Sequence, residues 1–147
     1  MKVEILVCSL DNPLLVGIYE NKKLIKEFKS EEHTSEALIE IFDEILQNYD
    51  IKSIIYANGP GSFMGIKVAF VILKTISVVK KCDFKAVSGF ELNNFSPIKA
   101  NKNLSFVYQN GDVKLAKIQS KNFKLPENLS NLNFINDTLP NYILSAI

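Results

Sequence analysis

Residues 53–65 read SIIYANGPGSFMG, an apolar strand pattern that runs into a glycine-rich turn, and a long apolar stretch follows in residues 66–81. Three glycines within seven residues give this turn main-chain freedom that a Cβ atom would remove, and its serine can cap the helix that follows. A strand, a tight turn and a helix N-terminus together often bind anions. The turn is therefore either a phosphate site or a joint that packs strand against helix, and its residues are Gly59, Pro60, Gly61, Ser62 and Gly65.

The turn departs from the known phosphate-binding patterns. A P-loop ends in Gly-Lys-Ser or Gly-Lys-Thr, whereas Gly65 is followed by Ile66 and Lys67. In a G-x-G-x-x-G dinucleotide motif, the third glycine would fall one residue earlier. Ser62 stands in GPGSF and not in the G-x-S-x-G sequence of a serine hydrolase. We expect a structural turn, with phosphate binding as the alternative.

The helix predicted over residues 66–81 is apolar on two sides. At about 100° per residue, six apolar residues point one way, toward a core: Val68, Ala69, Ile72, Leu73, Ile76 and Val79. The other side combines apolar residues with two lysines: Phe63, Lys67, Phe70, Val71, Lys74 and Val78. A face of this composition indicates a partner-binding surface, unless residues after position 95 fold over it.

Residues 34–49 predict a second amphipathic helix, with Thr34 or Ser35 as its N-terminal cap. From Glu31 to Tyr49 the chain carries six acidic residues and no lysine. Such a face is either solvated or docks on a basic partner. The only histidine, His33, precedes this helix, and we interpret it as a helix-entry residue because its motif offers no nucleophile.

Composition excludes several classes of site. The chain has 147 residues, 47% of them hydrophobic, which suffices for one ordinary domain with a proper core. It has no arginine, which excludes guanidinium clamps on phosphate, and its single histidine excludes a two-histidine metal site. No metal or cofactor is expected. Charge is uneven: residues 1–73 hold 7 lysines and 11 acidic residues, and residues 74–147 hold 10 lysines and 5 acidic residues.

The location of the protein is predicted from its cysteines and its apolar runs. Cys8 and Cys82 lie in apolar sequence, and the N-terminus lacks the layout of a signal peptide. No apolar run approaches the roughly 20 residues that span a membrane. We therefore expect a reduced, soluble, cytoplasmic protein with no membrane contact.

The predicted order of elements is βββαβαβα. Strands are predicted at residues 3–8, 14–19, 23–28, 53–58 and 84–88. The two long helices separate the last three strands, and one or two helical turns follow at residues 89–95. Antiparallel neighbours, followed by strands joined through helices, predict an α/β fold with a mixed sheet and helices on both faces. This is the arrangement of ribonuclease-H-like folds, which include the actin-like ATPases (the ASKHA superfamily).

We expect the chain to divide into residues 1–95, an N-terminal subdomain of the actin-like ATPase type, and residues 96–147, a shortened second subdomain or C-terminal extension. In the second part we predict two strands in a hairpin that turns at Asn110–Gly111, and one or two short helices. With about fifty residues after this boundary, we expect no complete nucleotide cleft between two equal lobes.

Three stretches resemble the TsaB (YeaZ) family. ANGPGSFMGIKVA, residues 57–69, is similar to the family signature GPGSFTG-[LV]-R-[IV]-G. EEHTSEALIEIFDEIL, residues 31–46, is similar to the segment that leads into the family's first helix. VSGFELNNF, residues 87–95, stands where the family has V-S-[ST]-L, with Ser88 matching. The resemblance covers about residues 3–95.

The resemblance implies a non-catalytic scaffold subunit. Such proteins are described as actin-like ATPase relatives that have lost catalysis. They bind the related subunit TsaD and, with the ATPase TsaE, support synthesis of threonylcarbamoyladenosine next to the anticodon of ANN-decoding tRNAs. The resemblance implies TsaD as the partner, TsaE and tRNA only through the complex, and a homodimer of the free protein. It also implies an interface on the first two long helices, so Ala37 and Ile41 join the stripe of residues 63–78 as expected contacts.

Some family positions differ in this chain. Ser9 stands where the family usually has Asp, Met64 replaces a threonine, Lys67 an arginine and Ala69 a glycine. The missing aspartate would hold the metal or water for phosphoryl transfer, and Asp11 lies beyond the strand. We therefore expect no enzyme. The alternative is an ATP-binding small-molecule phosphotransferase that uses the glycine turn, and a third, smaller hypothesis is direct contact between the lysines and tRNA.

Overall fold

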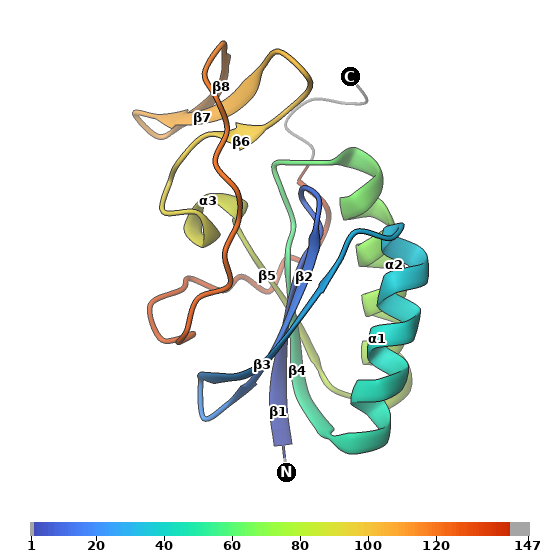
Figure 1. Ribbon diagram of the computed structural model, residues 1–147. Helices are drawn as coiled ribbons and strands as arrows, with labels where there is room; N and C mark the ends of the chain where they lie inside the picture. Colours follow the sequence, from blue (N-terminus) through green and yellow to red (C-terminus); the bar gives the residue numbers. More distant parts are fainter. Residues whose placement is uncertain (1, 142–147) are drawn as a thin grey trace.

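The computed structural model describes residues 2–141. Its main element is a five-stranded sheet with the strand order β3-β2-β1-β4-β5 (Figure 1). The strands are β1 (Lys2–Cys8), β2 (Leu14–Glu20), β3 (Lys23–Ser30), β4 (Asp50–Ala57) and β5 (Asp83–Val87). The α/β class and the mixed sheet predicted from the sequence are confirmed.

Strand pairing follows the length of the connections. β1, β2 and β3 are antiparallel neighbours, because short turns can only reverse the chain, whereas β4 pairs in parallel with β1 and with β5. Parallel strands need crossovers, which helices α1 (Thr34–Asn48) and α2 (Phe63–Lys80) supply. The predicted order βββαβαβα is confirmed, with α3 (Gly89–Leu92) as a single helical turn at its end.

Both long helices cover the same face of the sheet (Figure 1). The crossovers β3-α1-β4 and β4-α2-β5 proceed in the same direction across the sheet. Because crossovers between parallel strands are almost always right-handed, both helices arrive on one side. Helices were predicted on both faces of the sheet, and for the two long helices this prediction is wrong. Only the single turn α3, among the described helices, lies on the opposite side.

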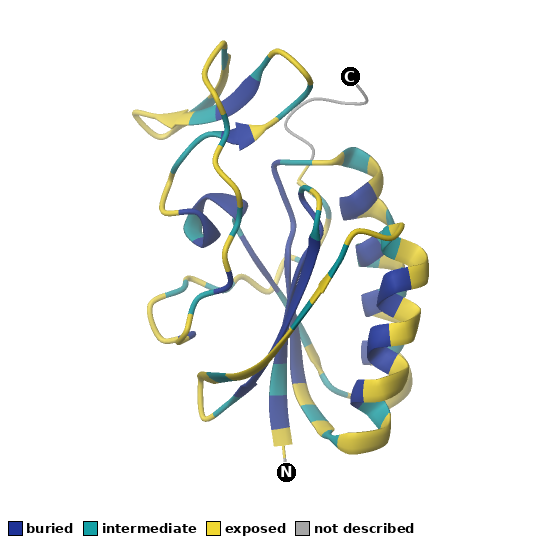
Figure 2. Ribbon diagram, in the orientation of Figure 1, coloured by how far each residue is buried: buried dark blue, intermediate teal, exposed yellow. Residues whose placement is uncertain are grey.

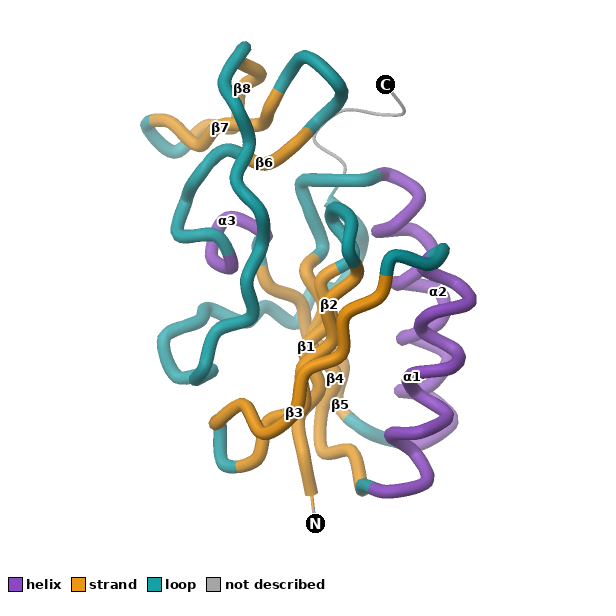
Figure 3. The backbone as a smooth tube through the Cα atoms, viewed as in Figure 1, coloured by secondary structure: helices purple, strands orange, loops and turns teal. Residues whose placement is uncertain are grey.

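That opposite face is covered by residues 121–141, which we call the C-terminal strap (Figure 3). Leu125 and Leu129 of the strap are buried in the same core as the strands. The hydroxyl of Tyr19 on β2 donates a 2.7 Å hydrogen bond to the carbonyl oxygen of Pro126. Isolated bridges join the strap to Lys23 at one edge strand and to Ala86 at the other. The strap therefore crosses the sheet from β3 to β5 and takes the place of a second layer of helices.

The inward sides of α1 and α2 are buried and their outward sides are exposed (Figure 2). On α2, Ala69 and Leu73 are buried, as the sequence predicts. Val79 was also predicted to face the core, but it is 68% exposed. It lies roughly 120° round the helix from Leu73, outside the arc that the sheet covers.

A second, three-stranded sheet contains β6 (Ile98–Lys99), β7 (Ser105–Gln109) and β8 (Asp112–Ala116) in that order. The hairpin predicted at Asn110–Gly111 is confirmed, and both turn residues have the positive φ angles, 53° and 81°, that a two-residue hairpin turn favours. β6 was not predicted, because two residues carry no period. The predicted short helices are absent from the described residues after β8. The boundary at residue 95 stays a prediction.

Candidate functional site

The glycine turn between β4 and α2 packs closely against the end of β1. A Cβ atom on Gly61 would lie 2.6 Å from the Cβ of Leu10, and one on Gly65 would lie 2.2 Å from the main-chain oxygen of Ser9. Both distances are far below van der Waals contact. At these two positions, glycine allows the first turn of α2 to touch the main chain that follows β1.

The polar groups of the turn bind one another and the end of β1. The Ser62 main-chain N–H donates to the carbonyl oxygen of Leu10 at 2.7 Å. Its side-chain oxygen accepts the N–H of Gly65 at 3.1 Å, so the cap predicted for Ser62 is confirmed. The main-chain oxygen of Gly59 accepts the N–H of Gly89, and Pro60 is buried. The main-chain amides of Ser62 and Gly65, at the start of α2, thus already donate hydrogen bonds within the chain. This favours a structural joint between strand and helix over a phosphate site, which would need such amides to be free.

Helix α1 begins differently. His33 is its N-cap residue, and no side chain caps it. The prediction that Thr34 or Ser35 caps this helix is therefore wrong, whereas the interpretation of His33 as a helix-entry residue is confirmed.

A hollow of about 750 Å³ lies between the first turns of α1 and α2 and the β1–β2 connection, with Lys99 at its border. We call it the helix-end hollow. Ser9, at the position of the family aspartate, lies at its wall, but its hydroxyl donates to the carbonyl oxygen of Gly65 at 2.9 Å. Asp11 also lines the hollow, and its carboxylate accepts the main-chain N–H of Asn12. The end of β1 therefore contributes a hydroxyl that is already bonded, and Asp11, two residues further along the chain, stands beyond the strand.

The outward side of α2 carries four of the residues expected at a partner interface. Val71 is 56% exposed and Val78 64% exposed, and both Lys67 and Lys74 are exposed beside them. Phe63 is half-buried and forms part of the wall of the helix-end hollow. The described residues after position 95 cover the opposite face of the sheet. They therefore do not cover the exposed side chains on the outward side of α2.

Three other expected contact residues lie elsewhere. Ala37 and Ile41 are buried on the inward side of α1 and offer no free surface. Phe70 is half-buried in a cluster of rings, with its centroid 6.2 Å from that of Tyr56 and 6.1 Å from that of Phe84. The sequence misplaced Phe70 because a period of 3.6 residues locates a side chain only to within about a quarter turn, and Phe70 stands at the border between the two sides of α2.

Two exposed residues were missed by the sequence analysis. Met64 is 60% exposed on α2, and Ile39 is exposed on α1. Met64, Val71 and Val78 stand seven residues apart along one side of the helix. This spacing, typical of helices that pack against other helices, was a signal in the sequence that could have identified Met64. We call these three residues the apolar stripe of α2.

Charge divides the outward surface of the two helices. The exposed acidic residues Glu36, Glu40 and Asp43 lie on α1, whereas α2 carries Lys67 and Lys74. Neither lysine forms an ion pair in the described part of the chain. The surface thus has an acidic half and a basic, apolar half.

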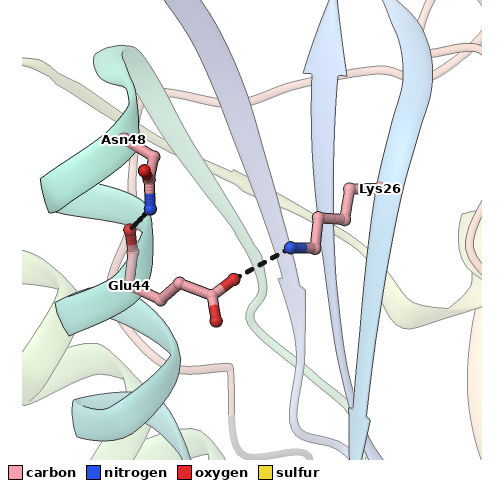
Figure 4. A network of polar contacts seen from close by, with 3 residues as sticks. All are labelled: Lys26, Glu44 and Asn48. Carbon is pink, nitrogen blue, oxygen red and sulfur yellow. Dashed lines mark hydrogen bonds and ion pairs between the residues drawn. The ribbon is translucent and has the colours of Figure 1, made fainter.

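The one ion pair among residues 2–141 joins α1 to β3 (Figure 4). The Lys26 ammonium donates to the Glu44 carboxylate at 2.9 Å, and this hydrogen bond raises the pKa of Lys26 above its ordinary value. The Asn48 side-chain amide donates to the main-chain oxygen of Glu44. Both charged side chains are about half exposed, so the pair adds little stability.

Neither cysteine has the environment of an activated thiol. Burial raises the pKa of Cys8 from 9.0 to about 12, and burial also raises the pKa of Cys82. Both thiols are free. Reactive cysteines require a lowered pKa, so neither is a candidate nucleophile.

Metal-binding clusters and membrane-spanning helices are both absent from the described residues. No three His, Cys, Asp or Glu side chains stand close enough together to bind a metal ion among residues 2–141. Over the same range, no helix has the length and apolar character needed to cross a membrane.

Comparison with known proteins gives matches in structure only. No protein-family model matches the chain, and no curated protein sequence matches it. Among solved structures, YeaZ from Pseudomonas aeruginosa matches with a TM-score of 0.57 and 14% sequence identity, over 79% of this chain and 65% of that one. An uncharacterized protein with similarity to the peptidase YeaZ, also from Pseudomonas aeruginosa, matches with a TM-score of 0.53 and 16% identity, over 79% of this chain and 64% of that one.

These neighbours share the fold of the chain. The family whose motifs the sequence resembles is thus the family of its structural neighbours, and the resemblance is confirmed at the level of the fold. The chain spans just under two thirds of the length of each neighbour.

Proposed function

We propose that this protein is a non-catalytic scaffold subunit that binds a TsaD-type partner, and TsaE through it, in the synthesis of threonylcarbamoyladenosine on tRNA. The observation that carries the proposal is the apolar stripe of α2, which stays open to solvent beside α1. The YeaZ-like fold and the signature in residues 57–69 support it. On this proposal the five-stranded sheet is the ribonuclease-H-like core of an actin-like ATPase subdomain, and the protein acts in the cytoplasm.

The stripe has the spacing that helix packing requires. Met64, Val71 and Val78 recur at seven-residue intervals, so they form one line along α2 and can insert between the side chains of facing helices. Each is more than half exposed. Covering such side chains releases roughly 25 cal/mol for each Å² of apolar surface removed from water. Lys67 and Lys74 border the line and favour an acidic partner surface.

The joint at the glycine turn has a supporting role in this proposal. It fixes the start of α2 to the end of β1 through Ser9, Leu10 and Gly65. A rigid helix loses little entropy on binding, so the stripe is presented in a fixed position. The bonded hydroxyl of Ser9, at the place of a catalytic aspartate, is consistent with a subunit that acts by contact.

Association is tested by light scattering and calorimetry of the full chain with TsaD from the same source. Val71→Glu and Val78→Glu should each weaken binding by about 2 kcal/mol, roughly thirty-fold, if they lie at the centre of the interface. Ile25→Glu is the matched control, because Ile25 is 45% exposed and lies on β3, outside both helices. Tight binding retained by both α2 variants would reject this face. Scattering of the free chain over a range of concentrations reports whether a second copy occupies the stripe when TsaD is absent.

The competing function is an ATP-binding phosphotransferase, and the helix-end hollow is the observation that favours it. Its position at the first turn of α2 suits a phosphate group. The hydrogen bonds of the glycine turn argue against this function, because the Ser9 hydroxyl and the main-chain amides of Ser62 and Gly65 already have partners within the chain. Calorimetric titration of ATP into the free chain and into its Met64→Glu variant separates the two. Binding that is lost in Met64→Glu, at the wall of the helix-end hollow, would support the phosphotransferase.

A further inference from the structure

A second hollow, of about 630 Å³, lies between the β1–β2 connection and the second sheet. Three segments of the described chain line it: residues 11–12, Lys99 with residues 101–105, and residues 117–120 with Asn122. None of them belongs to α1 or α2, so nothing inferred about this hollow depends on the association proposed above. Its volume falls within the range of small-ligand sites.

The walls of this hollow carry an excess of positive charge. Lys99, Lys102 and Lys117 line it, and Asp11 is the only carboxylate among the described residues of its lining. All three lysines are exposed, and none forms an ion pair in the described part of the chain. Residues 96–125 as a whole contain six lysines and one acidic residue. Like charges gathered without partners repel one another, so a bound anion would stabilise this arrangement. We call the site the lysine hollow.

Uncharged hydrogen-bond donors complete the lining. The side-chain oxygen of Asn101 accepts the main-chain N–H groups of Asn103 and Leu104, which fixes the loop and leaves its amide nitrogen without a partner among residues 2–141. Ser120 and Asn122 also line the hollow, and their side chains make no hydrogen bond within the same range. A ligand with several acceptor oxygens can use such donors together with the ammonium groups.

We propose that the lysine hollow is a binding site for phosphate groups. Lysine binds phosphate as a mobile point charge, and three of them can follow two or more linked phosphates without the fixed geometry that arginine imposes. The helix-end hollow next to it is a poor alternative for the same ligand, because it adds Glu31 and Glu32 to Asp11. The same chemistry is offered by a free polyphosphate chain, as in a nucleoside triphosphate, and by the backbone of single-stranded RNA.

The test is calorimetric titration of the full chain with tripolyphosphate, and polarisation of a labelled single-stranded RNA of about twelve nucleotides, both in about 50 mM salt. The variant is Lys99→Gln/Lys102→Gln/Lys117→Gln. A unit charge about 4 Å away in water contributes a factor of roughly five, so this variant should lose on the order of a hundred-fold in affinity. Asp11→Asn should bind several-fold more tightly, because it removes the opposing charge.

The matched control is Lys114→Gln/Lys121→Gln/Lys124→Gln. It removes the same charge from exposed lysines of the same part of the chain that lie outside the hollow. It should keep its affinity within about three-fold. Equal losses in both triple variants, or no binding of either ligand by the unmodified chain, would overturn the proposal. Binding of tripolyphosphate alone identifies a free polyphosphate as the source, and binding of RNA, with or without tripolyphosphate, identifies the nucleic-acid backbone.

Discussion

The hydroxyl of Ser9 donates a hydrogen bond to the main-chain carbonyl oxygen of Gly65, with the two oxygens 2.9 Å apart. The two residues are 56 positions apart in the chain. The Cα of Gly65 also lies so close to the main chain of Ser9 that a side chain at residue 65 would not fit between them. This contact fixes α2 to the central strand of the sheet, and with it the surface that we propose for association.

Gly65→Ala tests how tight this contact is. The new Cβ would lie 2.2 Å from the main-chain oxygen of Ser9, so we expect a loss of about 2 kcal/mol or more in the free energy of unfolding, measured in urea. Gly111→Ala is the control: it has a φ angle of +81° but no atom within 4 Å, and should cost only about 1 kcal/mol. Helix propensity alone predicts that Ala at residue 65 stabilises by about 1 kcal/mol, so a gain in stability would contradict the contact.

Phe70→Ala separates the ring cluster from the exposed stripe. Phe70 packs on Tyr56 and Phe84, and its truncation should lower the free energy of unfolding by about 2 kcal/mol, less than for a fully buried ring. Val71→Ala, at the neighbouring exposed position, should change it by less than about 0.5 kcal/mol. Similar values for both variants in thermal or urea unfolding would place Phe70 on the open surface.

Leu129→Ala tests whether the C-terminal strap belongs to the core. Leu129 is 1% exposed among the residues of the main core, so we expect a loss of about 2–5 kcal/mol in the free energy of unfolding. Leu139→Ala is the same chemical change at a position that is 64% exposed, and should be close to neutral. A neutral Leu129→Ala would mean that the strap does not cover this face in solution.

The buried thiol of Cys8 predicts a loss of stability at high pH. In the folded protein its pKa is raised by burial from 9.0 to about 12, so above pH 9 the unfolded chain loses its proton first. The stabilising contribution is complete below pH 9 and is lost as pH rises toward 12. From about pH 8 to about pH 10.5, the unmodified protein should lose about 2 kcal/mol more than Cys8→Ala. Equal pH slopes of urea unfolding in the two proteins would contradict the assignment to Cys8.

The sequence by itself determined the order of elements, and which strands run antiparallel and which run parallel. Short turns fixed the antiparallel hairpins, long apolar helices forced parallel crossovers, and Asn110–Gly111 fixed the second hairpin, because each of these signals is local. Ser62 was recognisable as a cap for the same reason. The resemblance of residues 57–69 to the TsaB signature also pointed to the fold, since three glycines at fixed spacing are a strong constraint.

Only the tertiary structure decided what lies on each surface. In the structure, Ala37 and Ile41 are buried, Phe70 packs in a cluster of rings, and Met64 is exposed. The sequence could not predict this, because a helical period gives the angle of a side chain around the helix axis but not the direction in which the neighbouring elements lie. The tertiary structure also assembled the lysine hollow from three segments that the chain sequence keeps apart. The position of the C-terminal strap could not be predicted from the sequence either, because its apolar residues are irregularly spaced. They pack onto the sheet because no long helix covers that face.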